Sequence, residues 1–166
     1  MSVRLAPEDG TIHEGTAFGA VESAADDAFA ETDGEVCLNT SMSGYQEILT
    51  DPSYRGQIIT MTCPHIGNYG VNSFDVESAR PHLAGFIVRE RSRMHSNYRS
   101  EGDLDEYLRR HQILGAEGID TRAVAKRLRE HGAMRGGLSI SDCSDDDLVG
   151  RARAAPGLIV RDLVRE

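Results

Sequence analysis

The densest run of side chains that could do chemistry in this 166-residue chain is Asn39 to Tyr54, NTSMSGYQEILTDPSY. It combines hydroxyls, an amide, carboxylates and phenols, which can hydrogen-bond a polar substrate or move protons. Ordinary turns use the same residue types, because Ser43-Gly44 can cap a short helix and Asp51-Pro52-Ser53 is typical of a type I turn. From spacing alone, the turn interpretation is favoured.

A second cluster, CPHIGNYGVN, offers Cys63 and His65 as metal ligands or as a thiol beside a base. A structural zinc site needs about four ligands in spaced pairs, and no second pair follows, so a Gly/Asn turn with His65 hydrogen-bonded in place is favoured. Cys143 has acidic neighbours, which disfavour a thiolate nucleophile. Since GxSxG, Walker A, GxGxxG and HExxH patterns are also missing, local motifs assemble no catalytic site and no metal site.

A basic stripe stands out against the acidic composition. Arg122, Lys126 and Arg129 recur at the spacing of one helix face. Such a stripe could meet an acidic partner surface, but it is more often a solvated face.

Charge and composition exclude several classes of protein. The 18 basic and 27 acidic residues give a net charge of −9, which repels nucleic acid and anionic membrane surfaces. No segment approaches the about 18 apolar residues of a membrane span. Three cysteines, an odd number, indicate reduced thiols and a cytoplasmic protein. The length and the 39% of hydrophobic residues predict one compact domain over residues 1–166.

The elements that must position these residues begin with strands. Val3–Gly19 alternates around Asp9-Gly10, which predicts a β-hairpin closed by a two-residue turn. Residues 20–34 contain Phe29 as their only large apolar side chain and are predicted to be a surface insertion with little burial. Further short strands are predicted at Glu35–Leu38, Gln57–Thr62 and His82–Arg89.

Helices dominate the second half. Asp103 begins an amphipathic helix over Leu104–His111, and Asp120 and Gly132 bound a second one over residues 121–131. A strand at Met134–Ile140 follows, and then a third helix begins at Ser144 and ends before Pro156. Strands first and helices later favour an α/β fold of α+β character, layered as a β/β/α sandwich, over an alternating doubly wound fold.

Several segments resemble one known family, the N-terminal domain of the carbamoyl-phosphate synthase small subunit. They are EDGTIHEG, NTSMSGYQEILTDPSY, PHIGNYGVN, GIDTRAVAKRLREHGAM and APGL, in family order. The stretch Val21–Asp33 is longer than the family pattern, and Cys37-Leu38 replaces its usual Val-Phe pair.

The resemblance implies a swivelling β/β/α sandwich within a heterodimeric ligase of pyrimidine and arginine biosynthesis. In that family the small subunit hydrolyses glutamine, and ammonia passes to a large subunit that makes carbamoyl phosphate with bicarbonate and ATP. The glutaminase Cys, His and Glu belong to a second domain that this chain lacks. We therefore expect an N-terminal piece that is inactive alone and has no cofactor of its own, with ATP and magnesium held by the large subunit.

The same resemblance assigns roles to individual residues. It implies that Ser53 contacts the glutamine substrate, and that Ser41, Met42 and Gly44 lie near the ammonia exit. It implies that Glu47 and Asp51 organise the loop and the large-subunit contact. Two alternatives stay open. The domain could be a non-catalytic docking module, or a stand-alone small-molecule-binding domain of the same fold.

Overall fold

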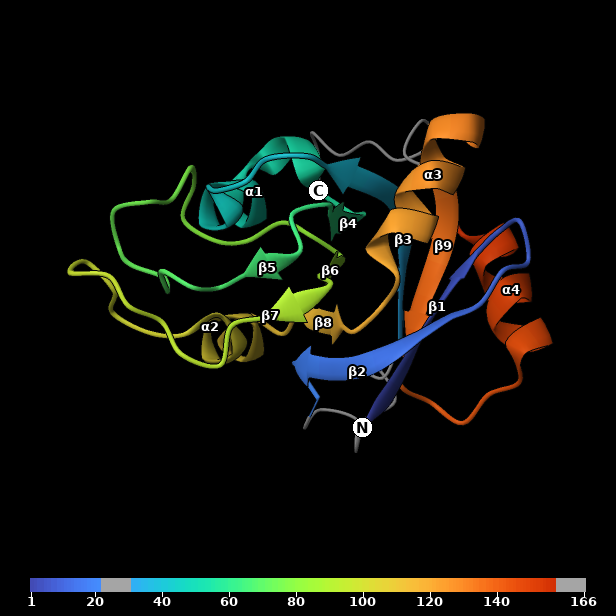
Figure 1. Ribbon diagram of the computed structural model, residues 1–166. Helices are drawn as coiled ribbons and strands as arrows, with labels where there is room; N and C mark the ends of the chain where they lie inside the picture. The colour runs from blue at the N-terminus through green and yellow to red at the C-terminus, as the bar shows by residue number, and fades with distance from the viewer. Residues whose placement is uncertain (22–30, 158–166) are drawn as a thin grey trace.

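The structure, a computed structural model, describes residues 1–21 and 31–157 (Figure 1). Strands of the described chain close a barrel in the order β1-β2-β8-β6-β4-β3-β9. These are β1 Ser2–Pro7, β2 His13–Gly19, β3 Glu31–Asn39, β4 Gln57–Met61, β6 Gly85–Ile87, β8 Leu114–Glu117 and β9 Met134–Ser139. β5 His65–Ile66 and β7 Glu90–Arg91 pair separately as a two-stranded sheet.

Four neighbouring barrel strands are parallel. β4 pairs with β3 and with β6, and β6 pairs with β8, through registers such as Val36↔Ile58 and Ile58↔Gly85. The carboxyl ends of β3 and β4 therefore meet at one rim, where the Thr62 amide donates a 3.0 Å hydrogen bond to the Asn39 carbonyl. The chain that follows each strand starts from this common rim.

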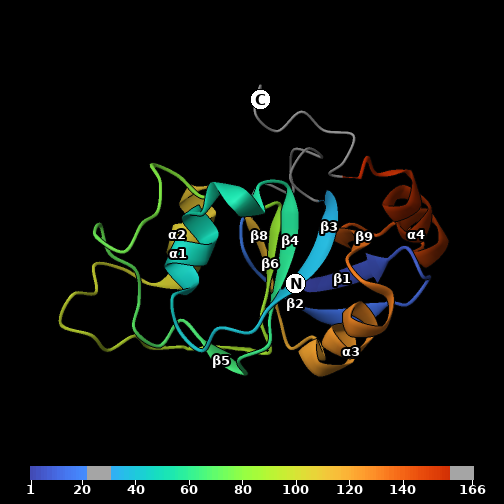
Figure 2. The same ribbon diagram turned by 90° about the horizontal axis from the view of Figure 1, so that it is seen from above.

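Helices cover the barrel on two sides (Figure 2). They are α1 Tyr45–Thr50, the 3₁₀ turn Pro52–Tyr54, α2 Leu104–Arg110, α3 Thr121–His131 and α4 Asp145–Ala154. Helices α1 and α2 bury Leu49 and Leu108 against Phe86 in one hydrophobic cluster. Helix α3 buries Val124 and Leu128 in a second cluster, built from side chains of β1, β3, β4, β6, β8 and β9.

Sequence signals at helix ends are confirmed. The side chains of Asp103, Asp120 and Ser144 accept hydrogen bonds from the first turns of α2, α3 and α4. Gly132 follows the end of α3 with a positive φ of 82°, a conformation that favours glycine. Local hydrogen bonding and chain geometry are enough to set these boundaries.

The predicted strands need corrections. The N-terminal hairpin forms, but residues 8–12 make a longer connection than the predicted two-residue turn. The strand predicted at His82–Arg89 is only Gly85–Ile87, and β8 was not predicted. The fold is mixed α/β, and the layered swivelling sandwich stays a prediction.

The prediction of a surface insertion over residues 20–34 is wrong at both of its ends, which the structure describes. Ala20 is buried, and residues 31–34 belong to β3, where Glu31–Gly34 pairs with Gly136–Ser139 of β9. This polar sequence forms a strand because its backbone pairs with that of β9. The Glu31 side chain adds to the pairing by accepting hydrogen bonds from Ser139 and Ser141. The middle of the predicted insertion, residues 22–30, lies outside the described residues.

The helices of the described chain are short. Within residues 1–21 and 31–157, no helix combines the length and the apolar character that crossing a bilayer requires.

Acid should destabilise the fold in two pH ranges. Burial is the main cause that lowers the pKa of His13 from its ordinary 6.5, and hydrogen bonding by Arg135 is the main cause that lowers the pKa of Glu8 from 4.5. Both folded-state values lie below the unfolded ones, so each contribution is present above the ordinary pKa and is lost as the pH falls below it. We expect urea midpoints to fall below about pH 6.5 and again below about pH 4.5.

The variant His13→Gln separates the two ranges. It should flatten the upper part of the profile and leave the lower part, to which Glu8 contributes, in place. Because burial also lowers the pKa of His82 and His111, part of the upper slope should persist in this variant. An upper slope that is identical in both proteins would contradict the assignment to His13.

Candidate functional site

The segment 39–54 leaves the barrel at the end of β3 and returns to it at β4. Its two ends are tied together, because the Asn39 amide nitrogen donates to the Tyr54 hydroxyl over 3.1 Å. The Asn39 side-chain oxygen also accepts from the Ser41 backbone amide at 2.8 Å. The segment is therefore a closed excursion with α1 at its centre.

The start of α1 is held by a residue from the second sequence cluster. Gly44 stands at the N-cap of α1 with a positive φ of 80°, as the Ser43-Gly44 pair predicts, but no side chain of this pair hydrogen-bonds to the helix start. Instead the Tyr69 hydroxyl accepts from the backbone amides of Gly44 at 2.5 Å and Tyr45 at 3.2 Å. The rings of Tyr45 and Tyr69 stack with centroids 4.3 Å apart. Burial raises the pKa of the Tyr69 phenol, so it stays neutral at pH 7.

The middle of α1 is fixed by a buried amide. The Gln46 side chain donates to the Asn72 carbonyl at 2.6 Å and accepts from the Asn72 amide at 2.9 Å. One turn later, the Thr50 hydroxyl accepts from the Glu77 amide at 2.9 Å. The loop after β5 thus supports α1 along its length, and the two sequence clusters form one unit.

Four of the predicted site residues gather at the first turn of α1. Ser41 and Met42 are exposed, with 84% of Met42 accessible to solvent. Gly44 adjoins Glu47, whose Oε2 atom is buried and has no hydrogen-bond partner among the described residues. An acceptor left unpaired in this way costs stability unless a donor reaches it.

The other two predicted site residues, Asp51 and Ser53, lie at the opposite end of α1. The Asp51 carboxylate accepts from the Ser53 backbone amide at 2.8 Å, and Tyr54 closes the predicted turn by donating to the Asp51 carbonyl at 3.1 Å. The Ser53 side chain is exposed on the 3₁₀ turn. The six residues of α1 span about 9 Å, so the structure does not bring Ser53 together with Ser41 and Met42.

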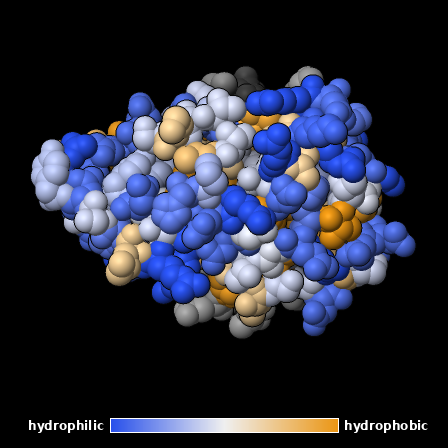
Figure 3. Space-filling model, viewed as in Figure 1, coloured by the Kyte–Doolittle hydropathy of each residue, from blue (hydrophilic) through white to orange (hydrophobic). Residues whose placement is uncertain are grey.

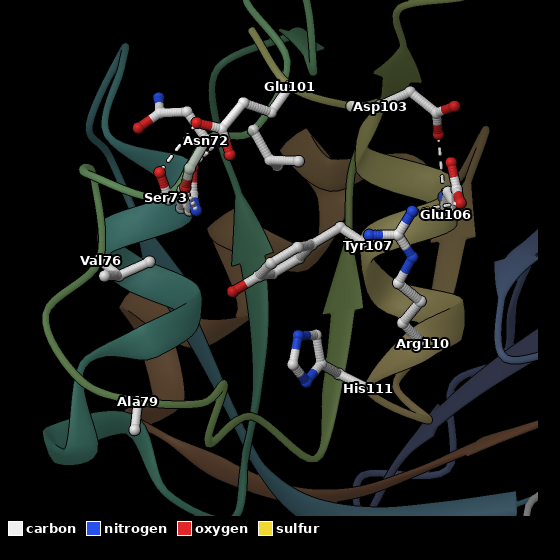
Figure 4. Close-up of a pocket in the computed structure, with 13 residues that line it drawn as sticks. Asn72, Ser73, Val76, Ala79, Glu101, Asp103, Glu106, Tyr107, Arg110 and His111 are labelled. Carbon is white, nitrogen blue, oxygen red and sulfur yellow. Dashed lines mark hydrogen bonds and ion pairs between the residues drawn. The ribbon is translucent and has the colours of Figure 1, made fainter. Parts of the chain in front are cut away.

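A cavity of about 230 Å³ lies beside Gln46, between the loop after β5 and α2 (Figure 4). The Tyr107 side chain extends across it, with Ser73 on one side and Arg110 on the other. Its carboxylates already have partners: Glu101 accepts from Ser73, Glu106 pairs with Arg110, and Asp103 accepts from the Glu106 backbone amide. The His111 ring also lines the cavity and makes no hydrogen bond within the described chain, so it is available there as a base.

The thiols and histidines do not form a reactive cluster. Burial raises the pKa of the Cys37 thiol to about 11, which keeps it protonated. Cys63 contacts the backbone carbonyl of His65, and the His65 ring lies 3.9 Å from the exposed Glu90 carboxylate. Within the described chain, no three side chains of the metal-binding types come together.

The order of these segments matches one protein family. The model of the carbamoyl-phosphate synthase small chain, CPSase domain, matches residues 5–138, which include both halves of the unit around α1. The chain belongs to this family. The resemblance carried by the sequence segments is confirmed.

Individual relatives agree with the family model. The carbamoyl phosphate synthase small chain of Rhodopirellula baltica is 58% identical over 99% of this chain and 40% of its own length. That of Syntrophotalea carbinolica is 53% identical over 100% of this chain and 42% of its own. The small chain of Aquifex aeolicus is 48% identical over 98% of this chain and 42% of its own length. The chain thus spans about two fifths of the length of these relatives.

Among solved structures, a peptidase M28 precursor from Shewanella amazonensis aligns with a TM-score of 0.39 at 6% identity. The alignment covers 82% of this chain and 33% of the peptidase chain. A likeness at this level carries no argument about fold or function.

Sequence reasoning missed the residues that support the site. Tyr69, Gln46 and Asn72 hold α1 in place, whereas the sequence drew attention to Cys63 and His65 in the same cluster. The local sequence carries no clear signal for Gln46, which lies between Tyr45 and Glu47, although a polar side chain on a buried face needs a specific partner.

Proposed function

We propose that this chain is the N-terminal part of the glutamine-hydrolysing small subunit of a carbamoyl-phosphate synthase. It would complete the glutamine cleft, line the route of ammonia and dock onto the large subunit, which would hold ATP and magnesium. The observation that carries the proposal is membership of the small-chain family across residues 5–138. A cytoplasmic location is part of the same proposal.

The geometry of α1 supports a division of roles. Ser53 is exposed on a turn whose backbone is fixed by Asp51, so its hydroxyl can donate to and accept from a polar substrate. At the other end, Gly44 lies beside the Glu47 Oε2 atom, which has no partner among the described residues, and the small Ser41 and unbranched Met42 are exposed just before it in the chain. We propose that the end of α1 with Ser53 contacts glutamine. The end with Gly44 would lie on the route of ammonia and contact the large subunit.

A docking role without any contact to glutamine is the second candidate. Large apolar side chains that belong to loops are exposed, with 76% of Phe74, 84% of Met94 and 96% of Tyr98 accessible. Exposed apolar side chains favour a protein interface where they form one contiguous patch. The two candidates differ in what Ser53 does.

Replacing Ser53 by alanine in the complete two-subunit enzyme separates them. We expect glutamine-dependent synthesis to lose about 2- to 13-fold in apparent affinity, which corresponds to one hydrogen bond of about 0.5–1.5 kcal/mol. Synthesis from free ammonia should be unchanged, because ammonia bypasses the cleft. Steady-state rates of carbamoyl phosphate formation with each nitrogen donor give the comparison.

The control is Ser96→Ala, an exposed serine on a different loop. It should leave both reactions unchanged. If Ser53→Ala leaves glutamine kinetics unchanged, the docking module is the better description. Equal damage to both reactions would mean that Ser53 supports the interface or the fold.

A further inference from the structure

A basic groove lies on the barrel side away from α1, between α3 and the end of β4. Its cavity, of about 330 Å³, is lined by three cations, two hydroxyls and one methyl group: Arg122, Lys126, Arg129, Thr62, Thr121 and Ala125. Figure 3 shows the surface over α3 as largely hydrophilic. No carboxylate is among these lining residues.

The three cations of the groove have no partner among the described residues. Within residues 1–21 and 31–157, neither Arg122 nor Lys126 nor Arg129 makes an ion pair or side-chain hydrogen bond, although Asp120 and Glu130 are close in sequence. By contrast, Arg127 on the same helix pairs with Asp9 at 2.8 Å. In a chain of net charge −9, an unneutralised cluster of this kind is a local exception.

This arrangement is unfavourable for the helix itself. Lys126 is one turn from both Arg122 and Arg129, and like charges at such spacings destabilise a helix. Arg122 also stands in the first turn of α3, where the helix dipole disfavours a positive charge. An anion in the groove would relieve both effects, so the cluster is better explained by binding than by stability.

The groove also has hydroxyls and a suitable place in the topology. Thr62 directly follows β4, at the rim where the parallel strands β3 and β4 end. Crevices beyond the carboxyl ends of parallel strands are common ligand sites. Thr60, on the same face of β4, is fully buried with a hydroxyl oxygen that has no partner among the described residues.

We propose that this groove binds a small molecule through a phosphate or diphosphate group. Arginine forks match the geometry of phosphate oxygens, and threonine hydroxyls can donate to the same oxygens. The cavity is at the lower end of the roughly 300–1,000 Å³ typical of small-molecule sites. Ser53 precedes β4 and Thr62 follows it, so about 16 Å of strand separates the groove from the proposed glutamine contact.

Calorimetric titration of this chain with inorganic pyrophosphate at low salt tests the proposal. We expect saturable one-to-one binding that weakens about tenfold in Arg122→Gln and in Arg129→Gln. Thr62→Val should weaken it several-fold with no change in charge. The matched control is Arg80→Gln, an exposed arginine outside the groove that should change affinity less than twofold.

Thermal unfolding of each variant checks that the fold is intact, and the groove arginine variants should be no less stable than the parent chain. Equal weakening by Arg80→Gln and Arg122→Gln would reduce the binding to general charge attraction and overturn the proposal. Failure of pyrophosphate to saturate the groove would overturn it too, and saturation by a polyglutamate peptide instead would assign the groove to an acidic protein surface. None of these outcomes depends on Ser53.

Discussion

Gln46→Leu should destabilise the protein by about 2–6 kcal/mol. Leucine has nearly the same size, but it leaves the amide and the carbonyl of Asn72 buried without partners. Each such loss costs about 1–3 kcal/mol. Urea unfolding followed by circular dichroism measures the change, and hydrogen exchange at the Asn72 amide should accelerate because its acceptor is gone.

The matched control for this prediction is Gln57→Leu. Gln57 is half-buried on β4, and its side chain makes no hydrogen bond within the described part of the chain. Its replacement should change stability by less than about 1 kcal/mol. A small effect of Gln46→Leu, comparable to that of the control, would show that the loop after β5 holds α1 by other contacts.

Gly34→Ala should cost about 2–3 kcal/mol, because there is no room for a side chain. A Cβ atom at this position would lie 2.4 Å from the Gly56 backbone carbonyl oxygen and 3.4 Å from the Ala84 Cβ. The obstacle is backbone, so the strands themselves must shift, which is at the upper end of the cost of overpacking. The free energy of unfolding measures the effect.

Asp33→Ala is the control on the neighbouring residue. Asp33 is exposed and keeps its place opposite Gly137 through the backbone alone, so its replacement should stay within about 0.5 kcal/mol. A surface insertion over residues 20–34 would tolerate both substitutions equally. A large difference between the two variants therefore tests directly whether β3 begins before residue 35.

The sequence predicted elements whose limits are set locally. The bounds predicted for the helix at 121–131 agree with the structure, because a capping aspartate and a terminal glycine act within one turn of the chain. The start of β3 was missed, since Glu31–Gly34 is polar and becomes a strand only through pairing with β9, which is distant in sequence. Strand formation of this kind depends on the partner more than on intrinsic preference.

In the candidate site too, local features were predicted and contacts between residues distant in sequence were not. Asp51-Pro52-Ser53 was predicted as a turn because proline and aspartate favour turns by themselves. The contact between Tyr69 and the start of α1 spans 24 to 25 residues, and no local pattern indicates it. The importance of the segment 39–54 was evident from its resemblance to a family, whereas the way it is held required the structure.

The closed barrel limits how this chain can join another. Every barrel strand is paired on both sides, from β1 with β2 around to β9 with β1. An edge strand that could be extended by a strand from a second protein does not exist in the described barrel, so strand addition is closed to partners there. At the barrel, recognition must therefore depend on side chains and loop shapes, which makes the affinity of an assembly on this surface sensitive to single substitutions rather than to backbone pairing.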